Sequence, residues 1–154
     1  MTAVQNFLEL CNREEYAAFA GIRGNASHPN INGSVLFYPT PYNGILIAAE
    51  VFGLPEHPAF LGMHIHETGD CTPPFDKTGM HYNPTNQSHP NHAGDLLPLL
   101  NNQGYAFLTF YDDRLSIPDI IGKSVIIHAN RDDFTTQPSG DSGEKIGCGV
   151  IMKV

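Results

Sequence analysis

Apolar and polar residues alternate over short runs along most of this chain, and glycine, proline or asparagine separates one run from the next. Such a pattern is typical of β-strands joined by turns. Near the N-terminus, Val4, Phe7, Leu8 and Cys11 instead recur at helical spacing. We therefore predict an all-β fold preceded by a short amphipathic helix. The expected strands cover residues 16–24, 33–38, 44–52, 62–66, 105–110, 123–128 and 147–152.

The dipeptide Asn43-Gly44 lies between two of the expected strands. Asparagine and glycine accept the positive φ that tight hairpin turns need, so we expect these two strands to pair. Residues 67–103 contain no convincing regular element. A segment of that length inside a compact domain is usually functional or disordered, and its histidines favour a functional loop.

Length and composition favour one folded domain. The chain has 154 residues, of which 41% are hydrophobic and 16% charged, and this excludes intrinsic disorder. The 15 glycines and 12 prolines are consistent with many short elements joined by turns. Because no repeat or linker is visible, we expect a single domain over residues 1–154, with residues 1–15 as an N-terminal helical extension.

The charge balance points away from large polyanionic partners. Eight basic and 16 acidic residues give a net charge of −8, which argues against nucleic acid and against an anionic membrane as partner. No apolar run reaches the length of about 18 residues that a membrane span needs. The first fifteen residues lack the pattern of a secretory signal, so we expect a cytoplasmic location, or a periplasmic or extracellular one if a leader was removed.

Six of the eight histidines lie in three segments, which indicates a metal site. His64 and His66 flank Ile65 in an expected strand, where residues two apart share a face. This pair alone does not distinguish two metal ligands from two surface histidines. His128 ends another apolar strand, and taken singly it is more typical of a strand end than of a ligand. Several imidazoles, however, form a suitable set of ligands for copper, which cycles between two oxidation states.

The segment HYNPTNQSHPNHAGD places three imidazoles and one carboxylate within fifteen residues. Its prolines and glycine allow the loop to fold back around one point. Three histidines and one aspartate suit tetrahedral zinc, and the four ligands leave no position for the water that a zinc hydrolase needs. The alternative is a polar surface loop. The expected zinc ligands are His81, His89, His92 and Asp95.

On these motifs the chain resembles the copper,zinc superoxide dismutase family, in particular its bacterial branch. GMHIHETGDCT is similar to the copper-site signature, the histidine loop has the H-x7-H-x2-H-x2-D spacing of the zinc site, and GDSGEKIGCGVI is similar to a second signature. The resemblance covers about residues 16–154. It implies an eight-stranded antiparallel Greek-key barrel with long metal-binding loops, and dismutation of superoxide to dioxygen and hydrogen peroxide. The implied ligands are His64, His66, His81 and His128 for copper, and His81, His89, His92 and Asp95 for zinc.

The resemblance implies further roles for individual residues. His81 would bridge the two metals and also supply a proton. Asp132 would accept hydrogen bonds from one copper-ligating and one zinc-ligating imidazole, the alternative being a solvated loop charge. Cys71 and Cys148 would form a disulfide, the alternative being free thiols. Cys11 lies outside the resemblance, and we expect it to be a buried small hydrophobe on the N-terminal helix.

Lys145 is a departure from the second signature, because the family has arginine there. A protein of net charge −8 repels superoxide at a distance, so a local positive charge must guide the anion within a Debye length of about 8 Å. Lysine keeps the charge of arginine but loses its planar fork. Glu144 and Asp141 weaken the local field, whereas Lys123 and Arg131 are candidates to compensate. An ordinary salt bridge is the alternative role of Lys145.

Two classes of function remain at this stage. One is a working superoxide dismutase, which we favour because every metal ligand is present. The other is a non-catalytic copper and zinc carrier or buffer protein of the same fold. The resemblance leaves a homodimer open and assigns no interface to it.

Overall fold

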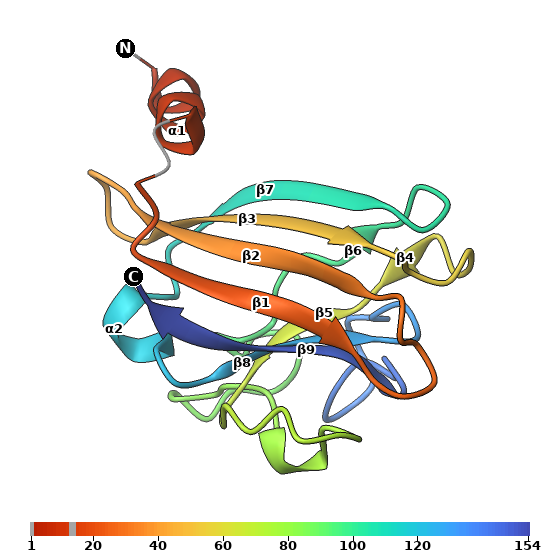
Figure 1. The fold of residues 1–154 in the computed structure, drawn as a ribbon. Coiled ribbons are helices and arrows are strands. Elements are labelled where there is room, and N and C mark those ends of the chain that lie inside the picture. The colour runs from red at the N-terminus through yellow and green to blue at the C-terminus, as the bar shows by residue number, and fades with distance from the viewer. Residues whose placement is uncertain (1, 13–14) are drawn as a thin grey trace.

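The computed structural model describes residues 2–12 and 15–154; residues 1, 13 and 14, part of the expected N-terminal extension, lie outside the described part. Strands joined by loops and turns form most of the fold (Figure 1). In β1 (Ala18–Gly24), Ala18, Ala20 and Ile22 are buried and the residues between them are more exposed. The remaining elements are α1 (Ala3–Asn12), β2 (Asn32–Pro39), β3 (Ile45–Phe52), β4 (Phe60–Leu61), β5 (Met63–His66), a 3-10 turn (Asp76–Thr78), β6 (Leu99–Leu100), β7 (Ala106–Asp112), α2 (Ile117–Ile120), β8 (Ser124–His128) and β9 (Lys145–Lys153).

Seven strands form one curled antiparallel sheet in the order β5-β8-β9-β1-β2-β3-β7, and β4 pairs with β6. The chain passes from β4 to β5 through Gly62, so residues 60–66 pair first with β6 and then with β8. This stretch therefore joins the two sheets. Counted as one strand, it gives eight strands in the described part of the chain. The predicted all-β barrel with a short N-terminal helix is confirmed.

The hairpin predicted at Asn43-Gly44 is present, because β2 and β3 pair along their whole length. The connection is longer than the tight turn we expected: it covers residues 40–44. Gly44 has a φ of +103°. A Cβ at this position would lie 2.5 Å from the carbonyl oxygen of Asp112, so both conformation and space require glycine.

The two faces of β5 and β8 pack against different apolar clusters. Ile65 belongs to the main apolar core inside the curled sheet. On the other side, Ile126 packs with Phe75 and Cys148. Cys148 forms a disulfide with Cys71, which is 77 residues away in sequence, and the predicted pairing is confirmed. The disulfide ties the long loop after β5 to strand β9.

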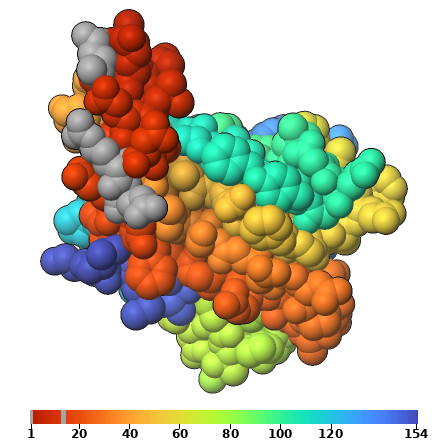
Figure 2. All heavy atoms as spheres, turned by 45° about the horizontal axis from the view of Figure 1, so that its top comes forward, coloured from red at the N-terminus to blue at the C-terminus, as the bar shows by residue number. Residues whose placement is uncertain are grey.

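Helix α1 lies on the outside of the barrel (Figure 2). The ring of Phe7 stacks on Tyr111 at 5.4 Å and meets Tyr42 edge-on at 5.7 Å. No described residue of this helix is buried, and Cys11 is a half-buried free thiol. The expectation that Cys11 is buried was therefore wrong, because an outer helix keeps its apolar side partly in solvent. No helix in the described residues has the length and apolar character to cross a membrane.

Candidate metal centre

All seven expected metal ligands are buried, and they come together in two groups that share His81. Within each group, every residue offers one ligand atom, and these atoms lie within 4.8 Å of one another. The sequence thus identified the members of both groups correctly as neighbours in space. The first group is His64, His66, His81 and His128, and the second is His81, His89, His92 and Asp95.

Strand β5 supports the histidine loop at both of its ends. The N–H of Tyr82 donates to the carbonyl of Ile65 at 2.7 Å, and the N–H of Ile65 donates to the carbonyl of Gly94 at 2.8 Å. A Cβ at Gly94 would clash with the Ile65 carbonyl, so glycine permits this approach. His81 and Asp95, the outer ligands of the loop, are therefore held next to the two histidines of β5.

His66 and His128 face each other through nitrogens that carry lone pairs. The Nδ1 of His66 lies 2.9 Å from the carbonyl oxygen of Gly79, and the Nδ1 of His128 lies 3.1 Å from that of Gly143. A carbonyl only accepts, so each Nδ1 is the donor, and each neutral ring keeps a lone pair on Nε2. The two Nε2 atoms are 3.3 Å apart. Lone pairs at this distance repel each other, whereas a cation between them attracts both.

Burial keeps these two rings neutral. Burial, together with the neighbouring His64, lowers the pKa of His128 to about 3. It also moves the pKa of His66 far below its ordinary value, and the charges of His128 and His81 add to this effect. Neutral imidazoles are the form that binds a metal.

Asp132 accepts a hydrogen bond from one ring of each group. Its Oδ2 lies 2.7 Å from the Nε2 of His64, and its Oδ1 lies 2.8 Å from the Nε2 of His89. The Nδ1 atoms of both rings are then buried without a hydrogen-bond partner. Although burial raises the pKa of Asp132, hydrogen bonds from His64, His89 and the N–H of Phe134 lower it overall. Asp132 thus sits where the resemblance implies, and it sets the tautomer of both rings.

His81 belongs to both groups, and its two ring nitrogens differ in their contacts. Its Nδ1 lies 2.7 Å from Asp95 Oδ1, whereas its Nε2 is buried without a partner. Its ring centre is 3.9 Å from that of His64 and 4.9 Å from that of His66. Burial lowers the pKa of His81 to about 4. Burial raises the pKa of Asp95, but the hydrogen bond and charge of His81 outweigh it and hold the value at about 2.

The second group also fits a cation. The Nδ1 of His89, whose proton is on Nε2, lies 3.1 Å from Asp95 Oδ2, so a lone pair faces a carboxylate. The Nδ1 of His92 lies 3.1 Å from the same oxygen. A metal ion among these atoms would satisfy all of them at once. Three imidazoles and one carboxylate are a donor set that zinc prefers.

Lys145 brings a positive charge to the first group. Its Nζ donates to Thr78 Oγ1 at 3.0 Å and to the carbonyl of Gly79 at 3.1 Å. The same Gly79 carbonyl orients His66, and the lysine charge lowers the pKa of both His66 and His128. The side chain thus lies beside the four-histidine group.

The other charged residues expected to weaken or support the positive field of Lys145 make contacts with other parts of the chain. The Nζ of Lys123 is 4.3 Å from the centre of the Tyr82 ring. Arg131 lines a surface cavity together with Asp141. Glu144 accepts a hydrogen bond from Asn25 at 2.8 Å. Within the described residues, Lys145 is therefore the basic side chain that the structure relates to the four-histidine group.

Sequence reasoning missed the main-chain atoms that orient the ligands. The carbonyls of Gly79 and Gly143 fix two rings, and a carbonyl leaves no signal in a sequence pattern. Gly140 is a further case: its φ is +69°, and a Cβ there would clash with Asp132 Oδ1 and lie 2.7 Å from His89 Nε2. Glycine at this position makes room for the Asp132–His89 hydrogen bond.

Comparison with known proteins agrees with this geometry. A family model described as copper/zinc superoxide dismutase (SODC) matches residues 31–151. The Cu-Zn superoxide dismutase of Legionella pneumophila is 39% identical over 127 residues, which cover 77% of this chain and 76% of that protein. The human copper chaperone for superoxide dismutase is 32% identical over 136 residues, which cover 80% of this chain but 49% of the chaperone.

A solved structure shares the fold. It is a double mutant of a SOD-like protein from Bacillus subtilis, with a TM-score of 0.80 and 29% identity, covering 90% of this chain and 99% of that one. The matches extend over most of the chain, and the two buried ligand groups fit the metals that the family is named for. The chain belongs to the copper/zinc superoxide dismutase family, and its cofactors are copper and zinc.

Proposed function

We propose that this protein is an active superoxide dismutase, which converts two superoxide anions and two protons into dioxygen and hydrogen peroxide. The observation that carries the proposal is the complete group of four buried histidines, of which His81 is one. Copper bound there would supply a centre that takes an electron from one superoxide and returns it to another, while zinc, which has no redox chemistry, would be structural.

We assign copper to His64, His66, His81 and His128, and zinc to His81, His89, His92 and Asp95. His81 belongs to both groups, its Nδ1 contacts Asp95 and its buried Nε2 is left without a partner, so we assign it as the bridge. Its Nε2 is also the atom we expect to hold the proton that is passed to the product. The place of the ring in the zinc-binding group, next to Asp95, would keep it in position while that proton moves.

Lys145 is the residue we expect to attract the anionic substrate. Its charge lies beside His66 and His128 in a chain of net charge −8. Its N–H groups are directed at oxygens of Phe75, Thr78 and Gly79. We therefore expect it to act through its charge more than through a direct hydrogen bond to superoxide.

A non-catalytic copper and zinc carrier is the second candidate. It is favoured by the likeness to a copper chaperone and to a SOD-like protein, and by lysine in place of arginine. The test is to load the protein with copper and zinc, measure metal per chain and the copper(II) spectrum, and then follow superoxide consumption. A loaded protein with one copper and one zinc that consumes superoxide supports the enzyme. Full loading without turnover supports the carrier.

We infer an oxidising compartment, periplasmic or extracellular, for the working protein. The support is the Cys71–Cys148 disulfide, because such bonds are rare in reducing compartments. Cell fractionation tests this inference. Recovery of the protein in the cytoplasmic fraction with both thiols reduced would contradict it and favour the cytoplasmic location expected from the sequence.

A further inference from the structure

We propose that Arg114 and Gln137 are positioning residues for zinc: they hold the main chain of His89, His92 and Asp95 from outside the loop that carries these ligands. The inference rests on the proposed zinc site and deepens it. It concerns how the loop is kept in a binding geometry, and it involves neither the copper ligands nor the substrate.

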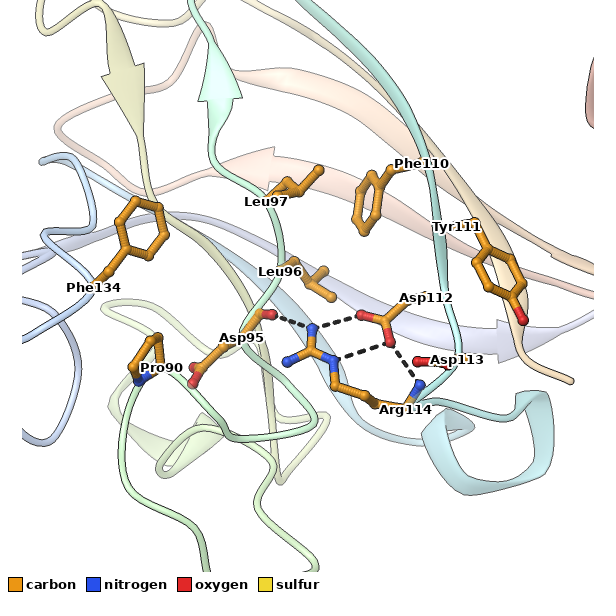
Figure 3. A pocket seen from close by; sticks show the side chains of 10 residues that line it. All are labelled: Pro90, Asp95, Leu96, Leu97, Phe110, Tyr111, Asp112, Asp113, Arg114 and Phe134. Atoms are coloured by element: carbon orange, nitrogen blue, oxygen red, sulfur yellow. Dashed lines mark hydrogen bonds and ion pairs between the residues drawn. The ribbon is translucent and has the colours of Figure 1, made fainter. Parts of the chain in front are cut away.

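Arg114 follows β7 and reaches the zinc-binding segment with both terminal nitrogens. Figure 3 shows the contact with Asp95. Its Nη1 donates to the carbonyl of His92 at 3.1 Å, and its Nη2 donates to the carbonyl of Asp95 at 2.6 Å. One guanidinium thus donates hydrogen bonds to two ligand residues that lie three positions apart. The contacts are to the backbone, so the ligand side chains stay free to bind the metal.

The buried carboxylate of Asp112 holds this guanidinium in place. Its Oδ1 accepts from the Nε of Arg114 at 3.1 Å, and its Oδ2 accepts from Nη2 at 2.7 Å. The main-chain N–H of Arg114 also donates to Oδ1, at 2.8 Å. Two carbonyls and one carboxylate therefore use the planar fork of donors at once, which the single ammonium of lysine cannot reproduce.

Gln137 acts on the third ligand from the opposite side. Its Oε1 accepts from the N–H of His89 at 3.0 Å, and its Nε2 donates to the carbonyl of His89 at 2.7 Å. A side-chain amide thus makes the pair of bonds that a neighbouring strand would make. Five residues earlier in the same loop, Asp132 holds the ring of His89. Both the backbone and the ring of this ligand are therefore held by the segment before β9.

The loop has little else to hold its middle part. Within the described residues, the other hydrogen bonds to the main chain of residues 83–93 are local: they join Asn86 to Asn83, Asn91 to Ser88, Gln87 to Asn83 and to Thr85, and His92 to Asp95. If the loop has already lost conformational freedom in the metal-free protein, it does not have to lose that freedom when zinc binds. The contacts of Arg114 and Gln137 therefore keep the zinc ligands together without metal and slow the release of zinc once it is bound.

The test compares zinc release to a chelator and the visible spectrum of Co²⁺ placed in the zinc site. The variants are Arg114→Met, Arg114→Lys and Gln137→Met in the full chain. Gln87→Met is the matched control, because within the described residues the Gln87 side chain bonds only to the carbonyl of Thr85 in the same loop. The Gln137→Met change is on an exposed side chain, so it stays informative if Arg114→Met does not fold.

We expect zinc release to become about 10- to 100-fold faster in Arg114→Met and Gln137→Met, with a changed Co²⁺ spectrum and retained copper. Arg114→Lys should not restore slow release, because it keeps the charge and loses the fork. Release rates and spectra equal to those of Gln87→Met would overturn this inference and leave the proposed function standing. A parent protein that binds no zinc would remove the proposed function and this inference together.

Discussion

The ammonium of Lys145 donates a hydrogen bond to the buried hydroxyl of Thr78 at 3.0 Å. Thr78 in turn donates to the carbonyl of Phe75 at 2.7 Å, so the lysine is tied to the short helical turn that follows the disulfide-bonded Cys71. Burial lowers the pKa of Lys145. The charge is thereby held in one position beside the copper-binding histidines.

This position predicts how Lys145 affects the rate. Lys145→Ala should reduce the rate of superoxide consumption about tenfold and flatten its dependence on salt, because less attraction is left to screen. Lys145→Arg should hold or raise the rate. The measurement is a salt series on copper-loaded proteins, with Lys77→Ala as control, since the Lys77 side chain is 71% exposed and 4.0 Å from Asp70. Equal rates and slopes in all four proteins would show that Lys145 does not guide the substrate.

Asp132→Asn should weaken metal binding while the fold is kept. An amide has one acceptor oxygen, so it cannot accept from both His64 and His89. We expect affinity for copper or zinc to fall about 10- to 100-fold. Asp133→Asn is the matched control, because within the described residues the side chain of this neighbour bonds only to Thr135 and Thr136. Unchanged metal affinity in Asp132→Asn would show that Asp132 is an ordinary loop carboxylate with no role in metal binding.

The assignment of His81 as the bridge predicts unequal effects of two histidine substitutions. His81→Ala should damage both metal sites, because this residue belongs to both groups. His128→Ala should lose copper and activity but keep zinc. Copper and zinc per chain, measured in both variants, decide between these patterns. Normal binding of both metals by His81→Ala would exclude the bridge.

The disulfide should be a major contributor to stability. Cross-linking residues 77 positions apart restricts the unfolded chain, and the chain-entropy model gives about 4 kcal/mol for a loop of this size. We expect Cys71→Ala to lower the free energy of unfolding by roughly this amount, and Cys11→Ala to leave it nearly unchanged. In denatured protein without reductant, Cys11 alone should react with a thiol reagent. Three reactive thiols in freshly isolated protein would contradict the pairing.

The metal-free protein should lose stability as the pH falls. The pKa of His81 is about 4 and that of His128 about 3 in the folded chain, while an unfolded histidine titrates near 6.5. Below about pH 6.5 the unfolded state therefore binds more protons, and each such histidine contributes about 1.4 kcal/mol of lost stability per pH unit. Denaturation with chelator from pH 4 to pH 8 measures the slope. His128→Gln should reduce it, and the exposed His57→Gln should not.

The sequence determined the strands and the ligands because both leave local marks. Burial alternates along β1 and along β3 from Ile47 onward, so these strands could be predicted from their own sequences without knowing their partners. The two-residue strands β4 and β6 were missed, because only their pairing with each other defines them. The spacing of the histidine loop likewise predicted the four side chains that the structure brings together, since coordination needs particular side chains.

Only the tertiary structure decided how those ligands are held. The carbonyl of Gly79 selects the nitrogen of His66 that faces the metal group, and Arg114 and Gln137 reach backbone atoms far away in sequence. Such contacts involve main-chain atoms that every residue possesses, so no residue type marks them in the sequence. They exist because folding brings segments up to 48 positions apart within hydrogen-bonding distance. Whether two groups form a hydrogen bond depends on the distance and the angle between donor and acceptor, which only the folded structure sets.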